Sequence, residues 1–365
     1  MDGESDADNG WQVPLPESTY ELVGQGGAEW LLLNALKNGR LPHAWLITGQ
    51  DGIGKATLAF RFARFLLRHG GDAKFISSAT DLHVAADDRI SRQISAGAAP
   101  DLLVLRRDRD PKTGTEKRDI SAESARRLPD FFSLTAGAGG WRVAIIDSAD
   151  DLNTHSANAL LKIIEEPPAR AVILIVASTP GRVLATIRSR CRKLCLMPLS
   201  DTVIGERLAA FGAPLDAEDL VLLLRLARGS LGRAIDLKLS RGLEQYRALI
   251  DVLQSLPLPN EMAAQRFLAK TLKGDEALEF SRVERLMTGA AEDAARAAIG
   301  YSAGGSTVVR DLALKAPASQ WAHLASVLQG LFARAHGLNL DHRAVTLEAL
   351  RQFSDTARGT VRGAA

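Results

Sequence analysis

Short apolar runs alternate with amphipathic stretches from about Tyr20 to Met197. Four runs with the character of buried strands are predicted at Ala44–Thr48, Asp101–Leu105, Arg142–Ile146 and Ala171–Ala177. Between them, Lys55–Arg68 places leucine, alanine and phenylalanine side chains on one helical face. Ala157–Ile164 repeats that spacing before Pro167 and Pro168 end the helix. Strands that alternate with helices predict an α/β fold built on a parallel sheet.

The pattern changes after Asp201, because no apolar run of this kind recurs. Glu218–Ala227 and Leu231–Leu239 are predicted helices, and prolines near residue 257 interrupt the chain before a further helical stretch. We therefore predict a small helical domain followed by a larger all-α domain. The expected boundaries are a disordered tail over 1–19, the α/β domain over 20–198, the small helical domain over 199–254 and the larger one over 255–365.

Composition excludes several classes of protein. The 365 residues include 45 Lys and Arg against 43 Asp and Glu, so a net charge of +2 gives no general attraction to nucleic acid. No apolar run approaches the ~20 residues that span a bilayer, and no membrane association is expected. The first ten residues are acidic and lack a signal-like apolar segment, which favours a cytoplasmic protein. Two cysteines, Cys191 and Cys195, fit a reducing compartment and suggest no metal site.

A glycine-rich segment joins the first predicted strand to the helix that follows it. Its sequence is Gly-Gln-Asp-Gly-Ile-Gly-Lys-Ala-Thr, which is typical of a phosphate-binding P-loop. Glycines let backbone N–H groups surround phosphate oxygens, and the helix N-terminus and the lysine add positive charge. The candidate nucleotide-binding residues are Gly49, Gly52, Gly54, Lys55, Ala56 and Thr57. A strict P-loop has a hydroxyl directly after the lysine to ligate Mg²⁺, and Ala56 lacks one, so Mg²⁺ binding is expected to be impaired.

A second candidate element is the strand that ends at Asp147. A carboxylate at this position holds the metal in P-loop ATPases. The next residue is Ser148, whose hydroxyl has no basicity near neutral pH and cannot activate water as a glutamate would. Asp150 and Asp151 are available carboxylates, but we predict that they cap the following helix.

Further segments follow in an order that carries a resemblance. They are LVGQ at Leu22–Gln25, RLPHAWLITG at Arg40–Gly49, IIDSADDLN at Ile145–Asn153, ANALLKIIEEPP at Ala157–Pro168 and ATIRSRC at Ala185–Cys191. Together with the P-loop they resemble clamp-loader subunits of the AAA+ class, and the delta-prime subunits of bacterial DNA polymerase III in particular. The resemblance covers roughly half of the chain.

The resemblance implies a function and a set of partners. It implies a nucleotide-binding domain, a helical lid and a helical collar that joins five subunits, with gamma/tau and delta subunits as neighbours. It also implies that Arg190 reaches a neighbour's ATP as an arginine finger, and that Ser178 holds the sensor-1 position. ATP or ADP would bind weakly or without hydrolysis. The complex would load a sliding clamp onto primed DNA.

Two departures from the family pattern concern the lid and a zinc module. Motor subunits carry a lid arginine, sensor 2, where this chain has Gly232, and Arg233 lies one step further around the helix. The four-cysteine zinc module of many relatives has no counterpart between His69 and Pro100, so no zinc is expected.

Ala56, Ser148 and Gly232 together favour a subunit that does not hydrolyse ATP. The retained Lys55, Asp147 and Ser178 leave open an active AAA+ motor, either a gamma/tau-like subunit or a related DNA remodeller. A third hypothesis is an unrelated P-loop enzyme such as a nucleotide kinase. This hypothesis does not explain the Ser-Arg-Cys segment.

Overall fold

The structure is a computed structural model that describes residues 15–108, 119–133, 140–210, 215–258, 260–271, 276–301 and 306–359. The chain divides into two compact units. The first runs to Asp216 and also includes Leu226–Ile235, and the second consists of Ala217–Arg225 and the chain from Asp236 onward. Residues 1–14 of the predicted tail lie outside the described residues.

A five-stranded parallel sheet forms the centre of the first unit, in the order β2-β3-β4-β1-β5. Its strands are β1 (Ala44–Thr48), β2 (Leu102–Leu105), β3 (Arg142–Asp147), β4 (Ala171–Ala177) and β5 (Arg192–Cys195). Every residue of β1 and β4 is buried, because helices cover both faces of the sheet. The four strands expected from apolar runs are confirmed. The fifth, β5, escapes such a prediction because only Leu194 is buried in this charged edge strand.

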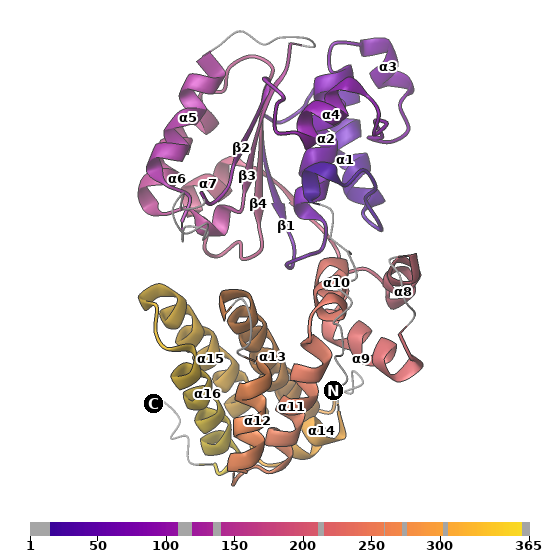
Figure 1. Ribbon diagram of the computed structural model, residues 1–365. Coiled ribbons are helices and arrows are strands. Elements are labelled where there is room, and N and C mark those ends of the chain that lie inside the picture. Colours follow the sequence, from indigo (N-terminus) through magenta and orange to yellow (C-terminus); the bar gives the residue numbers. More distant parts are fainter. Residues whose placement is uncertain are drawn as a thin grey trace, which may run out of the picture. The chain divides into compact units, whose positions relative to one another are not determined.

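Two layers of helices enclose this sheet (Figure 1). Trp45 and Ile47 of β1 face the core under one layer, while Ala44 and Leu46 face the core under the other. The first layer comprises α1 (Gly26–Lys37), α2 (Lys55–His69), α3 (Ala73–Ser78) and α4 (Arg89–Ser95). The second comprises α5 (Ala122–Ser133), α6 (Thr154–Glu165) and α7 (Ala185–Arg190), and α8 (Asp201–Ala210) follows the sheet.

Part of the predicted tail is structured. Pro16–Ser18 form a single 3₁₀ turn, η1, which packs on α2. Arg64 of α2 donates to the carbonyl of Glu17 at 2.8 Å, and Arg106 pairs with the Glu17 carboxylate at 3.1 Å. The expectation of disorder is therefore wrong for residues 15–19.

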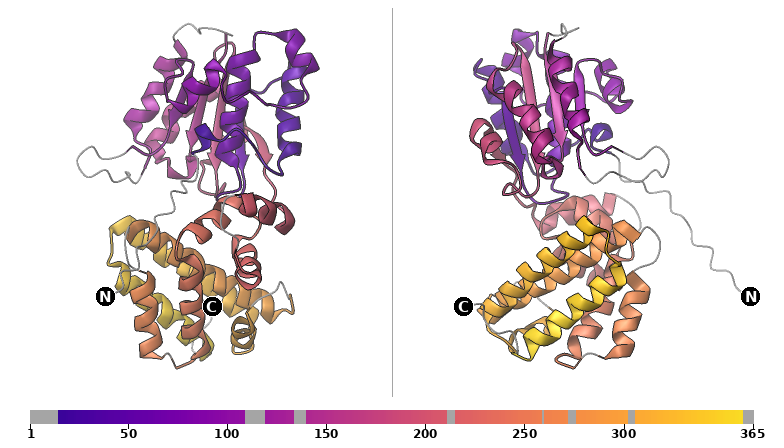
Figure 2. Two further views of the ribbon diagram at one scale, coloured as in Figure 1. Left: turned by 45° about the vertical axis from the view of Figure 1, so that its right-hand side comes forward. Right: turned by 90° about the vertical axis from the view of Figure 1, so that its left-hand side faces the viewer.

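The remaining regular elements of the described chain are helices. They are α9 (Ala217–Ala227), α10 (Leu231–Leu239), α11 (Gly242–Gln254), α12 (Glu261–Thr271), α13 (Glu276–Ala298), α14 (Thr307–Ala313), α15 (Ala318–Leu338) and α16 (His342–Ala357). In the second unit the long α13 and α15 pack side by side, and α16 packs on both (Figure 2). Buried Phe280, Phe332 and Phe353 contribute to its core.

The predicted fold class, an α/β unit with a parallel sheet followed by helices, is confirmed. Within the described residues, none of the helices combines the length and the apolar character that crossing a bilayer requires.

Candidate functional site

The glycine-rich loop lies where the sequence predicts it, between β1 and the N-terminus of α2. Gly52 has φ +72° and Gly54 has φ +101°, a backbone conformation that residues with a Cβ rarely adopt. Gly54 is the N-cap of α2, and no side chain caps this end of the helix. The first N–H groups of α2 therefore point from an uncapped, positively polarised helix end, which suits a phosphate group.

Lys55 is buried beside this loop, with 6% of its surface exposed. Its Nζ donates to the carbonyl oxygen of Gln50 at 2.9 Å, so the ammonium lies against its own loop. Burial lowers the pKa of Lys55, and the nearby carboxylates of Asp51, Asp150 and Asp147 oppose that shift. The loop thus keeps the cation that a phosphate-binding site needs.

The start of α10 lies directly on the loop, within the same compact unit. Gly232 donates its N–H to the carbonyl of Gly52 at 2.8 Å, and the Ser230 hydroxyl donates to the carbonyl of Asp51 at 2.6 Å. The side-chain amide of Gln50 donates to the carbonyl of Arg228 at 2.6 Å. Three hydrogen bonds therefore fasten the loop to residues 228–232.

This contact requires glycine on both sides. A Cβ atom added at Gly232 would lie 2.7 Å from the Cα of Gly52, and one added at Gly52 would lie 2.9 Å from the backbone nitrogen of Arg233. Backbone atoms cannot move aside as a flexible side chain can. Position 232, which the sequence predicts to correspond to sensor 2, therefore has no room for an arginine while the loop contact is intact.

Asp147 lies at the end of β3, on the loop side of the sheet. Burial raises the pKa of this carboxyl, while the positive charges of Arg106 and Lys55 act to lower it. The next residue, Ser148, donates its hydroxyl to the Asp150 carboxylate at 2.7 Å. A serine with its proton already engaged in this way is poorly placed to activate water.

Asp150 joins β3 to the segment after β4. Its carboxylate accepts the backbone N–H groups of Ser178 at 2.6 Å and Thr179 at 2.7 Å. The hydroxyl of Ser178 then donates to the Asp51 carboxylate in the loop at 3.1 Å. The structure thus brings the predicted sensor-1 residue to the P-loop, and Asp150 fixes its backbone.

The predicted capping role of the two aspartates is wrong. Asn153 is the N-cap of α6, and its side-chain oxygen accepts the N–H of Ser156 at 2.9 Å. Asp151 instead pairs with Arg107 at 3.3 Å. Both aspartates precede the true cap within a short 3₁₀ turn, Ala149–Asp151, which the sequence pattern did not distinguish from the start of the helix.

Ala56 and Thr57 occupy the first turn of α2, as predicted. Ala56 supplies no hydroxyl, so the position that usually ligates Mg²⁺ offers only a methyl group. Among the described residues there is no group of three or more His, Cys, Asp or Glu side chains that could hold a metal ion. The residues present suit phosphate better than they suit a phosphate-bound Mg²⁺.

Arg190 is the last residue of α7, and 41% of its side chain is exposed. Its Nη2 pairs with Oε1 of Glu165 at 2.8 Å, and its Nη1 donates to the carbonyl of Thr186 at 3.1 Å. These partners do not belong to the P-loop. Beyond it, Cys191 is buried, which raises the pKa of its thiol to about 11, whereas Cys195 is exposed.

Sequence reasoning missed Gln50 and Asp51 as contributors to this site. Both stand at variable positions of a P-loop pattern, and their partners, Arg228 and Ser178, follow more than a hundred residues later. The GSLGRA segment at Gly229–Ala234 was the one available signal for the contact with α10.

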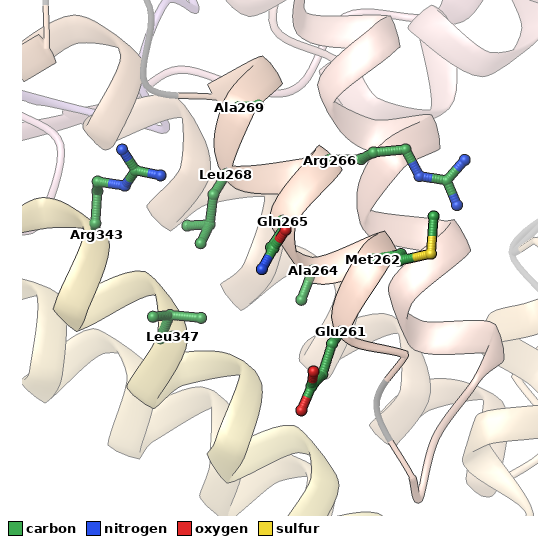
Figure 3. Close-up of a pocket in the computed structure, with 9 residues that line it drawn as sticks. All are labelled: Glu261, Met262, Ala264, Gln265, Arg266, Leu268, Ala269, Arg343 and Leu347. Carbon is green, nitrogen blue, oxygen red and sulfur yellow. The ribbon is translucent and has the colours of Figure 1, made fainter.

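A separate surface groove of about 700 Å³ lies between α12 and α16 of the second unit (Figure 3). Leu268 and Leu347 face it from opposite helices, with Arg343 beside Leu347. It shares no residue with the P-loop.

Comparison with known proteins finds a matching family model and similar sequences. Residues 24–200 match the family model described as DNA polymerase III, delta subunit. The chain is 34% identical over 189 residues to the DNA polymerase III subunit delta' of Pseudomonas aeruginosa, covering 52% of this chain and 53% of that protein. It is 31% identical over 227 residues to the tau/gamma subunit of Haemophilus influenzae, covering 61% of this chain and 30% of that protein.

The chain also aligns with the solved structure of a DNA polymerase III gamma subunit-related protein of Thermotoga maritima. Its TM-score is 0.41 at 16% identity, over 90% of this chain and all of that one. The chain spans about half or less of the length of the two curated relatives above. Residues 24–200 are thus similar to the DNA polymerase III, delta subunit family, and the resemblance predicted from the motifs is confirmed.

Proposed function

We propose that this chain is a delta-prime-like subunit of a bacterial clamp loader that does not itself hydrolyse ATP. It would assemble in the cytoplasm with gamma/tau and delta subunits as a hetero-pentamer, and load the sliding clamp onto primed DNA. Arg190 would act in trans, at the γ-phosphate of ATP held by the neighbouring subunit. In this proposal residues 20–198 form the nucleotide-binding domain, 199–254 the lid and 255–365 the collar.

The contact between Gly52 and Gly232 carries the proposal. In the motor subunits of the family that the chain resembles, the position of Gly232 is an arginine that senses bound nucleotide. Here the backbones meet so closely that an added Cβ would lie 2.7 Å from its neighbour. The engaged hydroxyl of Ser148 and the methyl group of Ala56 weaken two further catalytic positions. Together they support a subunit that stimulates hydrolysis without performing it.

ATP or ADP would bind at Gly49, Gly52, Gly54 and Lys55, with Thr57 the nearest hydroxyl in the sequence to the missing Mg²⁺ ligand. The uncapped N-terminus of α2 and the buried ammonium favour a phosphate group. The three hydrogen bonds to residues 228–232 would have to adjust around a nucleotide, so we expect weak binding. Zinc has no part in the proposal.

An active ATPase motor is the second candidate. Lys55, Asp147 and Ser178 are brought together around the loop, and the tau/gamma subunit of Haemophilus influenzae is 31% identical over 227 residues. This candidate requires that the isolated chain turn over ATP and that Lys55→Ala abolish the turnover.

The deciding experiment measures ATPase activity of the chain alone and of the reconstituted complex with clamp and primed DNA. We expect no turnover by the chain alone. In the complex, Arg190→Ala should leave assembly intact and remove the hydrolysis at the one site that it serves, where such fingers contribute roughly 10³–10⁵ in rate. Arg190→Lys should rescue poorly, because an ammonium lacks the planar fork of the guanidinium.

Arg192→Ala is the matched control, since Arg192 is an exposed arginine two residues away. It should change neither assembly nor ATPase rate. A complex with Arg190→Ala that hydrolyses ATP and loads clamps at the wild-type rate would refute the trans role of Arg190. Robust turnover by the chain alone would instead favour the motor.

A further inference from the structure

Glu165 and Arg190 form an ion pair between the ends of two helices. Glu165 is the last residue of α6 and Arg190 the last residue of α7, and the two helices pack together. Nη2 of Arg190 lies 2.8 Å from Oε1 of Glu165, with 41% of the arginine and 47% of the glutamate side chain exposed. Neither residue therefore serves the core by burial.

The position of Glu165 is unfavourable for its own helix. The C-terminal end of a helix carries partial negative charge, so a carboxylate there is destabilising and a cation is stabilising. Arg190 at the end of α7 follows this rule, whereas Glu165 at the end of α6 opposes it. The contact with Arg190 offsets this cost.

Contacts within its own chain hold two nitrogens of the Arg190 guanidinium. Nη2 faces Glu165, while Nη1 donates to the carbonyl of Thr186 at 3.1 Å and lies 3.4 Å from the Ser189 hydroxyl. A guanidinium has five N–H donors. These contacts therefore fix the plane of the group and leave other N–H donors available to a phosphate. An exposed arginine otherwise samples many rotamers, and ordering it against a phosphate costs conformational entropy.

We propose that Glu165 is a positioning residue for Arg190. It holds the guanidinium in one orientation on the surface. The arginine side chain therefore loses less conformational entropy when it contacts the neighbour's γ-phosphate. The inference rests on the proposed trans role of Arg190. Glu165 itself does not touch the nucleotide and acts only through the arginine.

The test uses the reconstituted complex and measures the Arg190-dependent ATPase, which is the rate of a given complex minus the rate of the same complex with Arg190→Ala added. Glu165→Ala should lower this quantity by up to about five-fold, the upper end for an exposed ion pair. The KM for ATP should stay unchanged, because the arginine acts on charge that develops in the transition state. Glu165→Gln keeps an oxygen acceptor and should give an intermediate rate.

A double variant separates positioning from a general structural role. Glu165→Ala should have no further effect in the Arg190→Ala background, because Glu165 affects the rate only through Arg190. Glu166→Ala is the matched control: Glu166 is the next residue, carries the same charge and is also exposed, and the change should leave the rate as in the wild type.

The outcomes distinguish this inference from the function on which it rests. If Arg190→Ala changes nothing, the proposed function fails. If Arg190→Ala removes activity while Glu165→Ala retains the full rate, only the positioning role is overturned. A higher rate with Glu165→Ala, or an equal loss in the Arg190→Ala background, overturns it as well.

Discussion

At the scale of single residues, two glycines decide what the loop can do. Gly52 and Gly232 let the P-loop backbone touch the first turn of α10, and the N–H of Gly232 bonds the carbonyl of Gly52 at 2.8 Å. The same contact excludes any larger residue at position 232. The absence of a side chain at Gly232 therefore has two consequences. It allows the close backbone contact with the loop, and it removes a group that could act in catalysis.

Gly232→Ala should destabilise the protein by about 1–2 kcal/mol. Helix propensity alone would favour alanine by at most about 1 kcal/mol, but the added Cβ would lie 2.7 Å from the Cα of Gly52. Forcing extra atoms into a packed contact typically costs about 1–3 kcal/mol, so overpacking outweighs propensity. Urea unfolding of the full chain measures the difference.

Gly205→Ala is the control for that measurement. Gly205 lies within α8, and no atom beyond the local backbone of that helix lies within 4 Å of the position where its Cβ would stand. This variant should be as stable as the wild type or more stable by up to about 1 kcal/mol. Equal stability of the two variants would mean that the loop does not depend on the close contact.

At the scale of elements, the buried strands could be predicted because both faces of the sheet are covered. β1 and β4 are buried throughout and apolar apart from Thr48, and their bounds agree with the prediction. β5 could not be predicted, since an edge strand needs only one buried residue in four and its register comes from pairing with β1. Local pattern carries no information about such a partner.

The candidate site divides in the same way. The glycine loop and Asp147 could be predicted, because a motif between a strand and a helix is local in sequence. The Asp150 network could not, since its acceptor and its donors at Ser178 and Thr179 are 28 and 29 residues apart. A carboxylate before a helix resembles a cap until the neighbouring strand is in place.

Arg282 links α10 and α13 in the second unit. Only 7% of its side chain is exposed, and it pairs with Asp236 at 3.0 Å and with Glu279 at 3.0 Å. Burial acts to lower its pKa, but hydrogen bonds and charge from Asp236 and Glu279 outweigh burial and raise the pKa. The guanidinium therefore stays charged and tied to both helices.

Arg282→Ala should cost about 2–3 kcal/mol in the free energy of unfolding. Losing one partner of a buried ion pair costs about 3–5 kcal/mol, and the partial exposure of Asp236 reduces that figure here. Arg285→Ala is the matched comparison, because Arg285 also pairs with Asp236 but keeps 36% of its side chain exposed. It should cost less than about 1 kcal/mol. Similar costs in urea unfolding would contradict a special role for Arg282.

At the scale of the whole molecule, the chain crosses between its two units more than once. Ala217–Arg225 belongs with the second unit, while Leu226–Ile235 belongs with the first. Arg225 donates to the hydroxyl of Tyr246 at 2.9 Å and so ties α9 to α11. A truncation at a single point therefore cannot separate the units cleanly, and point substitutions are better probes of each.

Calorimetry of the full chain should resolve two unfolding transitions, because each unit has a core of its own. Gly232 makes its contact inside the first unit, and Arg282 pairs inside the second. Gly232→Ala should therefore lower the temperature of one transition, and Arg282→Ala that of the other, each by several degrees for a loss of 1–2 kcal/mol or more. A single transition whose van't Hoff and calorimetric enthalpies agree, shifted by both variants, would show instead that the two units unfold as one cooperative body.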